Sequence, residues 1–295
     1  MFNYTPLCEE RRTVILDTDI GPDCDDAGAI MLLFRLHKKY GFSVGGIVNC
    51  TSNPHGCGAA AAIARYLEEP LPLLGQFEGK GFLQDTTRYN KYLDEHMACA
   101  YETVPALSLY ESVLKSAPDG GVTVITIGQF NTLAAAMKKF PSLFKKKVHA
   151  VISMAAQFPD GNREYNITCD SASAKYVLEH TTVPFILSGY EVGGSILSGY
   201  RTIPEDAERD PVYTAYRLYN KSETPVRSSW DLTAVQYAVC GDGDFYKLSP
   251  PGRMTVGKLT GRTRFTSDEG GSIRYMIKTA SDDEIAAHLN KVCFL

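Results

Sequence analysis

The strongest chemical signal in the chain is a group of five carboxylates within ten residues near its start. The group consists of Asp17, Asp19, Asp23, Asp25 and Asp26. Carboxylates this close repel one another, and they ionise together near neutral pH only when a cation or hydrogen-bond donors compensate. A ligand set made only of oxygens suits a hard cation such as Ca²⁺ or Mg²⁺. The segment therefore predicts a divalent metal site.

The acidic segment lies between a predicted strand at residues 13–16 and a predicted helix at residues 25–38. Side chains alternate along a strand, so Asp17 and Asp19 point to one face at its end. Asp25 and Asp26 come at the start of the helix, where the helix dipole favours negative charge. Gly21 permits the tight turn between them. In open α/β sheets ligands bind beyond the carboxyl ends of strands, which is where this loop lies.

Two other kinds of acidic loop can be compared with this one. An EF-hand loop needs a glycine in its middle and a glutamate at its end, where this chain has Pro22 and Gly28. The EF-hand is therefore excluded. Phosphatases of the haloacid-dehalogenase type also carry Asp-x-Asp after a first strand, followed by Thr or Val and a hydrophobic residue. This chain continues instead with Ile20, Gly21 and Pro22.

Along the rest of the chain, short apolar runs alternate with amphipathic helical patterns. Strands are predicted at residues 13–16, 42–48, 72–74, 122–127, 148–154 and 184–187, and helices at 25–38, 58–67, 106–115, 133–140, 171–179, 229–239 and 282–290. Residues 75–103 form a long polar excursion that could cover a site, and a hairpin is expected around Gly252 and Gly257. The alternation predicts the α/β class, with a mainly parallel open sheet flanked by helices. Residues 1–295 are expected to form a single domain.

Composition excludes several classes of function. A net charge of −4 does not provide the positive charge that binding to nucleic acid or to an anionic membrane requires. No apolar run is long enough to cross a bilayer. Residues 1–12 lack the apolar core of a signal peptide, so we expect a cytoplasmic protein, with a secreted mature form lacking its signal as the alternative. The eight cysteines form no CxxC pair and are expected to be free thiols.

Four further segments carry polar groups after predicted strands or at a helix start. They are Gly-Ile-Val-Asn-Cys-Thr-Ser-Asn at 46–53, Ile-Thr-Ile-Gly-Gln-Phe-Asn-Thr-Leu-Ala at 125–134, Gly-Asn-Arg-Glu-Tyr-Asn-Ile-Thr-Cys-Asp at 161–170 and Ser-Trp-Asp-Leu-Thr-Ala-Val at 229–235. Together with the acidic segment, they resemble in order and spacing the motifs of the nucleoside hydrolase family of the inosine-uridine preferring type. The acidic segment is a variant two residues longer than the family's signature.

The resemblance implies a Rossmann-like nucleoside hydrolase fold and Ca²⁺-dependent hydrolysis of the N-glycosidic bond of a ribonucleoside or a related ribosyl conjugate. It implies that Ca²⁺ is held by Asp19, Asp26, the backbone carbonyl of Ile127 and Asp231. Asp19 is the expected general base, taking a proton from the metal-bound water. The residues expected to contact the sugar are Asn53, Glu164, Asn166 and either Asp23 or Asp25, a choice that the longer loop leaves open. The substrate is a small molecule, and a homo-oligomer is expected.

The chain departs from the family where its well-known members carry a histidine that helps to protonate the leaving base. Trp230 stands there, and its indole can only donate a hydrogen bond. Trp230 could stack on the aglycone or belong to the core. Tyr213, Tyr216 and Tyr219 are candidate aglycone contacts or proton donors, although a buried helix face explains at least two of them. Arg227 is a candidate for neutralising a leaving group.

Two alternative functions stay open at this point. A Mg²⁺-dependent phosphohydrolase would use Asp17 as its nucleophile and would need a downstream lysine that the sequence does not place. A catalytically silent relative that binds a nucleoside or a sugar would explain the missing histidine.

Overall fold

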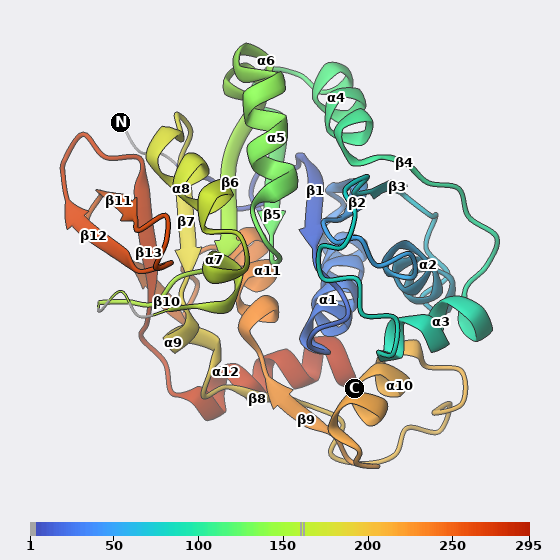
Figure 1. Cartoon of the computed structure of the whole chain (residues 1–295). Helices are drawn as coiled ribbons and strands as arrows, with labels where there is room; N and C mark the ends of the chain where they lie inside the picture. The colour runs from blue at the N-terminus through green and yellow to red at the C-terminus, as the bar shows by residue number, and fades with distance from the viewer. Residues whose placement is uncertain (1–3, 160, 162) are drawn as a thin grey trace.

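The computed structural model describes residues 4–159, 161 and 163–295 and is built around one large twisted sheet (Figure 1). Within these residues the sheet has 11 strands, ten of them in the order β12-β11-β13-β7-β6-β5-β1-β2-β3-β4, with β10 beside β13. The parallel strands are β1 (Thr13–Thr18), β2 (Ser43–Asn49), β3 (Leu73–Gln76), β4 (Val104–Pro105), β5 (Val122–Thr126), β6 (Val148–Met154), β7 (Phe185–Ser188) and β13 (Ile273–Lys278). The antiparallel strands are β10 (Tyr246–Leu248), β11 (Gly252–Val256) and β12 (Thr263–Ser267).

Two hydrophobic cores cover the two faces of the sheet. The first contains side chains of α1 (Asp25–Tyr40), α2 (Gly56–Tyr66), α10 (Pro211–Asn220), α11 (Trp230–Cys240) and α12 (Asp282–Leu289). The second contains side chains of α4 (Ala106–Ser116), α5 (Asn131–Lys139) and α8 (Ser171–His180). Val14 and Leu16 of β1 enter the first core, and Ile15 enters the second. This explains why β1 reads as an unbroken apolar run, as expected for a parallel strand covered on both faces.

Shorter elements complete the chain. They are α3 (Tyr89–Met97), α6 (Pro141–Lys147), α7 (Tyr165–Cys169), α9 (Tyr190–Gly193), a π-helical turn (Asn290–Phe294) and a separate pair of antiparallel strands, β8 (Leu197–Gly199) and β9 (Val226–Ser228). In the described part of the chain no helix has both the length and the apolar character needed to cross a bilayer. All eight cysteines are unpaired thiols.

The direction of strand order reverses at β1. The chain adds β2, β3 and β4 on one side of β1 and adds β5, β6 and β7 on the other. Loops that leave the carboxyl ends of β1 and β5 therefore diverge and open a crevice, which is the usual ligand site of such sheets. The acidic segment leaves β1, and residues 127–130 leave β5, so both face this crevice.

The predicted mainly parallel sheet flanked by helices is confirmed. The hairpin expected around residues 252 and 257 is formed by β11 and β12. The polar excursion at residues 75–103 contains a helix that the sequence analysis did not predict, α3. It packs on α2 and α10 with only Tyr89, Asn90 and Leu93 buried. Its apolar positions were too few to produce a clear helical period.

Gly128 brings the loop after β5 close to the end of β1. A Cβ atom at this position would lie 2.7 Å from both the backbone nitrogen of Asp19 and the sulfur of Cys50. We predict that Gly128→Ala lowers the free energy of unfolding by about 1–3 kcal/mol, because the backbone must move to accept the methyl group. Urea unfolding measures this change. Gly270→Ala is the control: its Cβ would meet no atom closer than 3.4 Å. Equal stability of both variants would contradict the prediction.

Candidate active site

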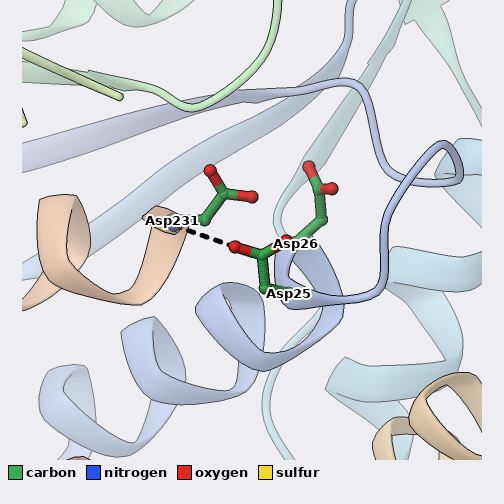
Figure 2. Close-up of side chains that lie close together, drawn as sticks. All are labelled: Asp25, Asp26 and Asp231. Carbon is green, nitrogen blue, oxygen red and sulfur yellow. Dashed lines mark hydrogen bonds between the residues drawn. The ribbon is translucent and has the colours of Figure 1, made fainter. Parts of the chain in front are cut away.

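Three buried carboxylates from two distant parts of the sequence meet in the crevice. Asp25 and Asp26 lie in the first turn of α1, and Asp231 lies in the first turn of α11. One oxygen of each carboxylate lies within 4.8 Å of the others. The backbone N–H of Asp231 donates to Oδ2 of Asp25 at 3.1 Å (Figure 2). We call Asp25, Asp26 and Asp231 the carboxylate cluster.

The carboxylate cluster is electrostatically unfavourable on its own. Burial raises the pKa of Asp25, Asp26 and Asp231 well above the ordinary value, and the charges of neighbouring aspartates raise these pKa values further. The N-termini of two helices, with their partial positive charge, point at the group and offset only part of this cost. Oxygen ligands at this spacing fit a hard divalent cation. The cluster is therefore a candidate metal centre.

Asp19 lies outside the carboxylate cluster but borders the same cavity. Nε2 of Gln129 donates to Oδ2 of Asp19 at 2.7 Å and to Oδ1 of Asn166 at 3.1 Å. Burial raises the pKa of Asp19 to about 6, although the bond from Gln129 lowers it. A carboxylate held in one orientation, with a pKa in this range, is suited to accept a proton near neutral pH.

The backbone carbonyl of Ile127 lies at the end of β5, beside the cavity. It accepts a hydrogen bond from Nδ2 of Asn166 at 3.0 Å, and the same nitrogen donates to the carbonyl of Met154 at 3.1 Å. Asn166 therefore connects the ends of β5 and β6. The four residues predicted as metal ligands, Asp19, Asp26, Ile127 and Asp231, all line one cavity.

Glu164 is held at the edge of the cavity by backbone donors. Its carboxylate accepts from the N–H groups of Asn166 at 2.8 Å, Ile167 at 3.1 Å and Ala156 at 3.0 Å, so it caps α7. Burial raises its pKa to about 7. Glu164 and Asn166 both line the cavity, as predicted for sugar contacts.

Asn53 lies in a smaller cavity of about 100 Å³ that also borders Asp19. Its Nδ2 donates to the carbonyl of Asp85, and its Oδ1 accepts from the N–H of His55 at 2.9 Å. The structure thus places Asn53 next to the main cavity, while its polar atoms hold the surrounding loops together.

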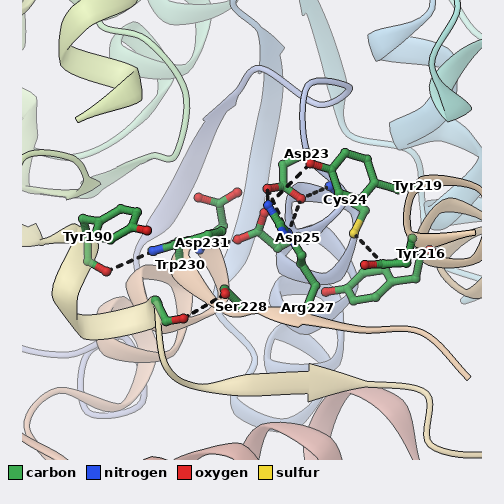
Figure 3. A network of polar contacts seen from close by, with 12 residues as sticks. Asp23, Cys24, Asp25, Tyr190, Tyr216, Tyr219, Arg227, Ser228, Trp230 and Asp231 are labelled. Atoms are coloured by element: carbon green, nitrogen blue, oxygen red, sulfur yellow. Dashed lines mark hydrogen bonds and ion pairs between the residues drawn. The ribbon is translucent and has the colours of Figure 1, made fainter. Parts of the chain in front are cut away.

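The structure separates the two aspartates between which the sequence could not choose. Asp25 belongs to the carboxylate cluster. Asp23 points instead to Arg227, whose Nη2 lies 2.6 Å from its Oδ2 (Figure 3). Both residues line the main cavity. Asp23 is therefore paired with a cation, while its charge still raises the pKa of Asp25.

Aromatic residues form the wall of the cavity next to Arg227. The indole N–H of Trp230 donates to the carbonyl of Tyr190 at 2.9 Å, so its single donor is occupied (Figure 3). Tyr219 lines the cavity with Trp230 and Tyr190. Tyr213 and Tyr216 are buried in the core and do not reach it. The helix-face interpretation therefore holds for these two tyrosines.

The main cavity measures about 370 Å³, which is enough for a small-molecule ligand. Five of its lining residues were not predicted: Pro22, Arg88, Met154, Tyr165 and Tyr190. Met154 ends β6, and Tyr190 lies two residues after the end of β7, so their places at the carboxyl ends of predicted strands were usable signals. Arg88 comes from a connection whose course no sequence pattern indicates. Gln129 was also missed as the partner of Asp19.

Comparison with known proteins agrees with this geometry. The sequence model of the inosine-uridine preferring nucleoside hydrolase family matches residues 14–271 of this chain. Solved structures with the same fold include an inosine-guanosine nucleoside hydrolase, with 17% identity, a TM-score of 0.75, and coverage of 96% of this chain and 99% of that chain. Another is the inosine-uridine preferring nucleoside hydrolase from Bacillus anthracis, with 15% identity, a TM-score of 0.73, and coverage of 96% and 99%. No curated protein sequence matches the chain.

A third similar structure is the effector protein XOO4466, with 12% identity, a TM-score of 0.75, and coverage of 96% of this chain and 93% of that chain. At such identities these structures show the fold alone. The match over residues 14–271 goes further: the chain belongs to the inosine-uridine preferring nucleoside hydrolase family, whose members are N-glycosyl hydrolases. The family expected from the sequence motifs is confirmed.

The raised pKa values predict how the metal-free protein responds to pH. Asp19, Asp17 and Glu164 have folded-state pKa values of about 6, 7 and 7, above those of the unfolded chain. The folded state then binds more protons, so stability is highest below the unfolded pKa values and falls as pH rises through the folded ones. We expect the melting temperature in EDTA to fall between about pH 5 and pH 8.

Removing one charge tests the origin of this pH dependence. In EDTA, Asp231→Asn is expected to reduce the fall in melting temperature, since the neighbouring carboxylates lose a repulsive partner. Asp283→Asn, at an exposed position in the first turn of α12, is the matched control and should behave like the wild type. A wild-type melting temperature that rises over this pH range would show that the cluster does not govern stability.

Proposed function

We propose that this chain is a Ca²⁺-dependent hydrolase that cleaves the N-glycosidic bond of a ribonucleoside or a related ribosyl conjugate, with Asp19 as the general base. The observation that supports it best is the carboxylate cluster, which lines the same cavity as Asp19, a cavity large enough for a nucleoside. The fold and the family support hydrolysis of nucleosides. The carboxylate cluster is the evidence for the proposed metal ion.

The proposed ligands are Asp19, Asp26, the carbonyl of Ile127 and Asp231. We add Asp25, because its carboxylate lies with those of Asp26 and Asp231 and no basic side chain pairs with it among the described residues. Oxygen-only donors favour Ca²⁺ over softer metals. When bound, a divalent cation would offset the repulsion within the cluster and make a coordinated water more acidic.

The side chains of this protein then divide the remaining work. Asp19, oriented by Gln129, accepts the proton of the attacking water. Glu164, Asn166 and Asn53 contact sugar hydroxyls from two sides of Asp19. Cleavage of the glycosidic bond develops positive charge on the sugar ring. The surrounding carboxylates complement that charge and so lower the barrier.

The first test is a panel of nucleosides assayed for release of reducing sugar. We expect EDTA to abolish turnover, added Ca²⁺ to restore it, and Asp19→Asn to lower kcat by about 100-fold or more, the scale of a lost general base. Asp283→Asn should keep full activity. Activity that persists in EDTA and in Asp19→Asn would refute both the metal and the base. Circular dichroism checks that the variants fold.

The same panel decides between the alternatives. ADP-ribose is included because the similar effector protein XopQ was solved in complex with adenosine diphosphate ribose. Nucleoside 5′-monophosphates are assayed beside the panel, and Mg²⁺-dependent release of inorganic phosphate from them without reducing sugar would instead support a phosphohydrolase. A ribose-dependent rise in melting temperature with no turnover of any substrate would support a catalytically silent binding protein.

Gln129 gives a second prediction, for a positioning residue. Gln129→Met removes the donor to Asp19 while it keeps the side-chain volume, and we expect kcat to fall by about 10–100-fold. The bond from Gln129 lowers the pKa of Asp19, so its loss should shift the acidic limb of the kcat/KM profile to higher pH. A purely structural effect would lower activity without moving that limb.

A further inference from the structure

The cavity has no visible acid for the departing base. No histidine lines it among the described residues, and the only N–H of the Trp230 indole is bonded to the carbonyl of Tyr190 at 2.9 Å. Breaking the bond between the sugar and a nitrogen base leaves an electron pair on the base. The base must therefore be protonated, or its negative charge must be stabilised in another way. Arg227 lies in a position to stabilise this charge.

Arg227 is fixed at the cavity wall by three partners. Its Nε donates to both carboxylate oxygens of Asp23, at 3.0 and 3.1 Å, and its Nη2 donates to Oδ2 at 2.6 Å. The guanidinium carbon lies 5.2 Å from the ring centre of Tyr219 and 5.2 Å from that of Trp230. A planar guanidinium held between a carboxylate and two rings loses little further freedom when it binds a ligand.

Part of this guanidinium remains available. Within residues 4–159, 161 and 163–295, Nη1 has no hydrogen-bond partner, and 31% of the Arg227 side chain is exposed, on the cavity side. The other basic residue that lines the cavity, Arg88, pairs with Asp85 at 2.8 Å and is half-exposed. Arg227 thus provides N–H donors beside Trp230, which adjoins Asp231 of the carboxylate cluster.

We infer that Arg227 stabilises the departing aglycone as an anion, in place of a proton donor, and thereby makes the enzyme selective for aglycones that leave with negative charge. This rests on the proposed nucleosidase function. The bond between C1′ and the base nitrogen breaks, and its electron pair moves to the base. The water oxygen bonds to C1′, and its proton passes to Asp19. The released anion, hydrogen-bonded to Arg227, takes a proton from solvent.

Arginine suits this role because it remains charged and gives up no proton. The carboxylate of Asp23 raises the pKa of Arg227 still further. The rate enhancement that Arg227 provides must therefore depend on the charge that the leaving group acquires. Hypoxanthine leaves inosine as an anion. Nicotinamide leaves nicotinamide riboside as a neutral molecule, so a cationic side chain has no developing charge to stabilise there.

The experiment compares inosine with nicotinamide riboside in the metal-loaded protein. We expect Arg227→Met to lower kcat/KM for inosine by about 100-fold, the scale of one lost transition-state donor, and to leave the value for nicotinamide riboside within about threefold. Arg253→Met is the matched control, because Arg253 pairs with Asp268 on the exposed surface. It should leave both substrates unaffected.

Other outcomes separate the inference from the function on which it rests. Equal losses on both substrates would show that Arg227 only supports the shape of the site, and would overturn the inference alone. Tyr219→Phe gives a second check, because the tyrosine hydroxyl accepts from Nη2 of Arg227 at 3.4 Å. A loss on inosine alone in Tyr219→Phe, with no such loss in Arg227→Met, would assign the stabilisation of the leaving group to the tyrosine hydroxyl and overturn the inference. Wild-type protein that releases no ribose from either substrate would overturn the proposed function as well. Melting temperatures confirm that each variant folds.

Discussion

The site depends on the repulsion among carboxylates that the fold holds out of water. Asp25, Asp26 and Asp231 sit where two helices begin, at the point where the order of the parallel strands reverses. Burial raises the pKa of each, and no basic side chain lies within the group. Such an arrangement costs stability unless a cation joins it. Gly128 and the amide of Asn166 keep the ends of β1, β5 and β6 close together beside these carboxylates.

One acid of the loop forms an ion pair with a neighbouring cation. Asp23 lies two residues before Asp25, yet its carboxylate faces Arg227. The guanidinium in turn lies between the rings of Tyr219 and Trp230. The acidic loop therefore links the carboxylate cluster to the aromatic end of the cavity. A change at Asp23 is expected to act on both ends, through the orientation of Arg227 and through the charge near Asp25.

Much of the fold and the centre of the site were predictable from the sequence, because both follow from local patterns. Apolar runs followed by Asp17, Asn49 and Ile127 mark strand ends, and parallel strands bring such ends to one edge. The division between Asp23 and Asp25 was not predictable, since it depends on where Arg227, some 200 residues later, is placed by β9. The role of Gln129 was hidden for a similar reason: its partners Asp19 and Asn166 are distant in sequence. Arg88 reaches the cavity from the long connection before α3, where no periodic pattern constrains the path.

The charges of the cavity are arranged in the order that heterolysis of a glycosidic bond needs. Carboxylates gather at one end of the cavity, and the guanidinium of Arg227 lies beside Tyr219 and Trp230. In the proposed mechanism the sugar ring gains positive charge at the carboxylates, and the base gains negative charge at Arg227. A field oriented in this way is present before the substrate arrives, so little reorganisation accompanies the reaction. A histidine acid transfers a proton and can serve only while it is protonated, whereas a guanidinium acts over the whole neutral range. In the proposed mechanism, replacing the acid by a fixed cation changes which leaving groups are favoured, while Asp19 keeps its role in the attack on the sugar.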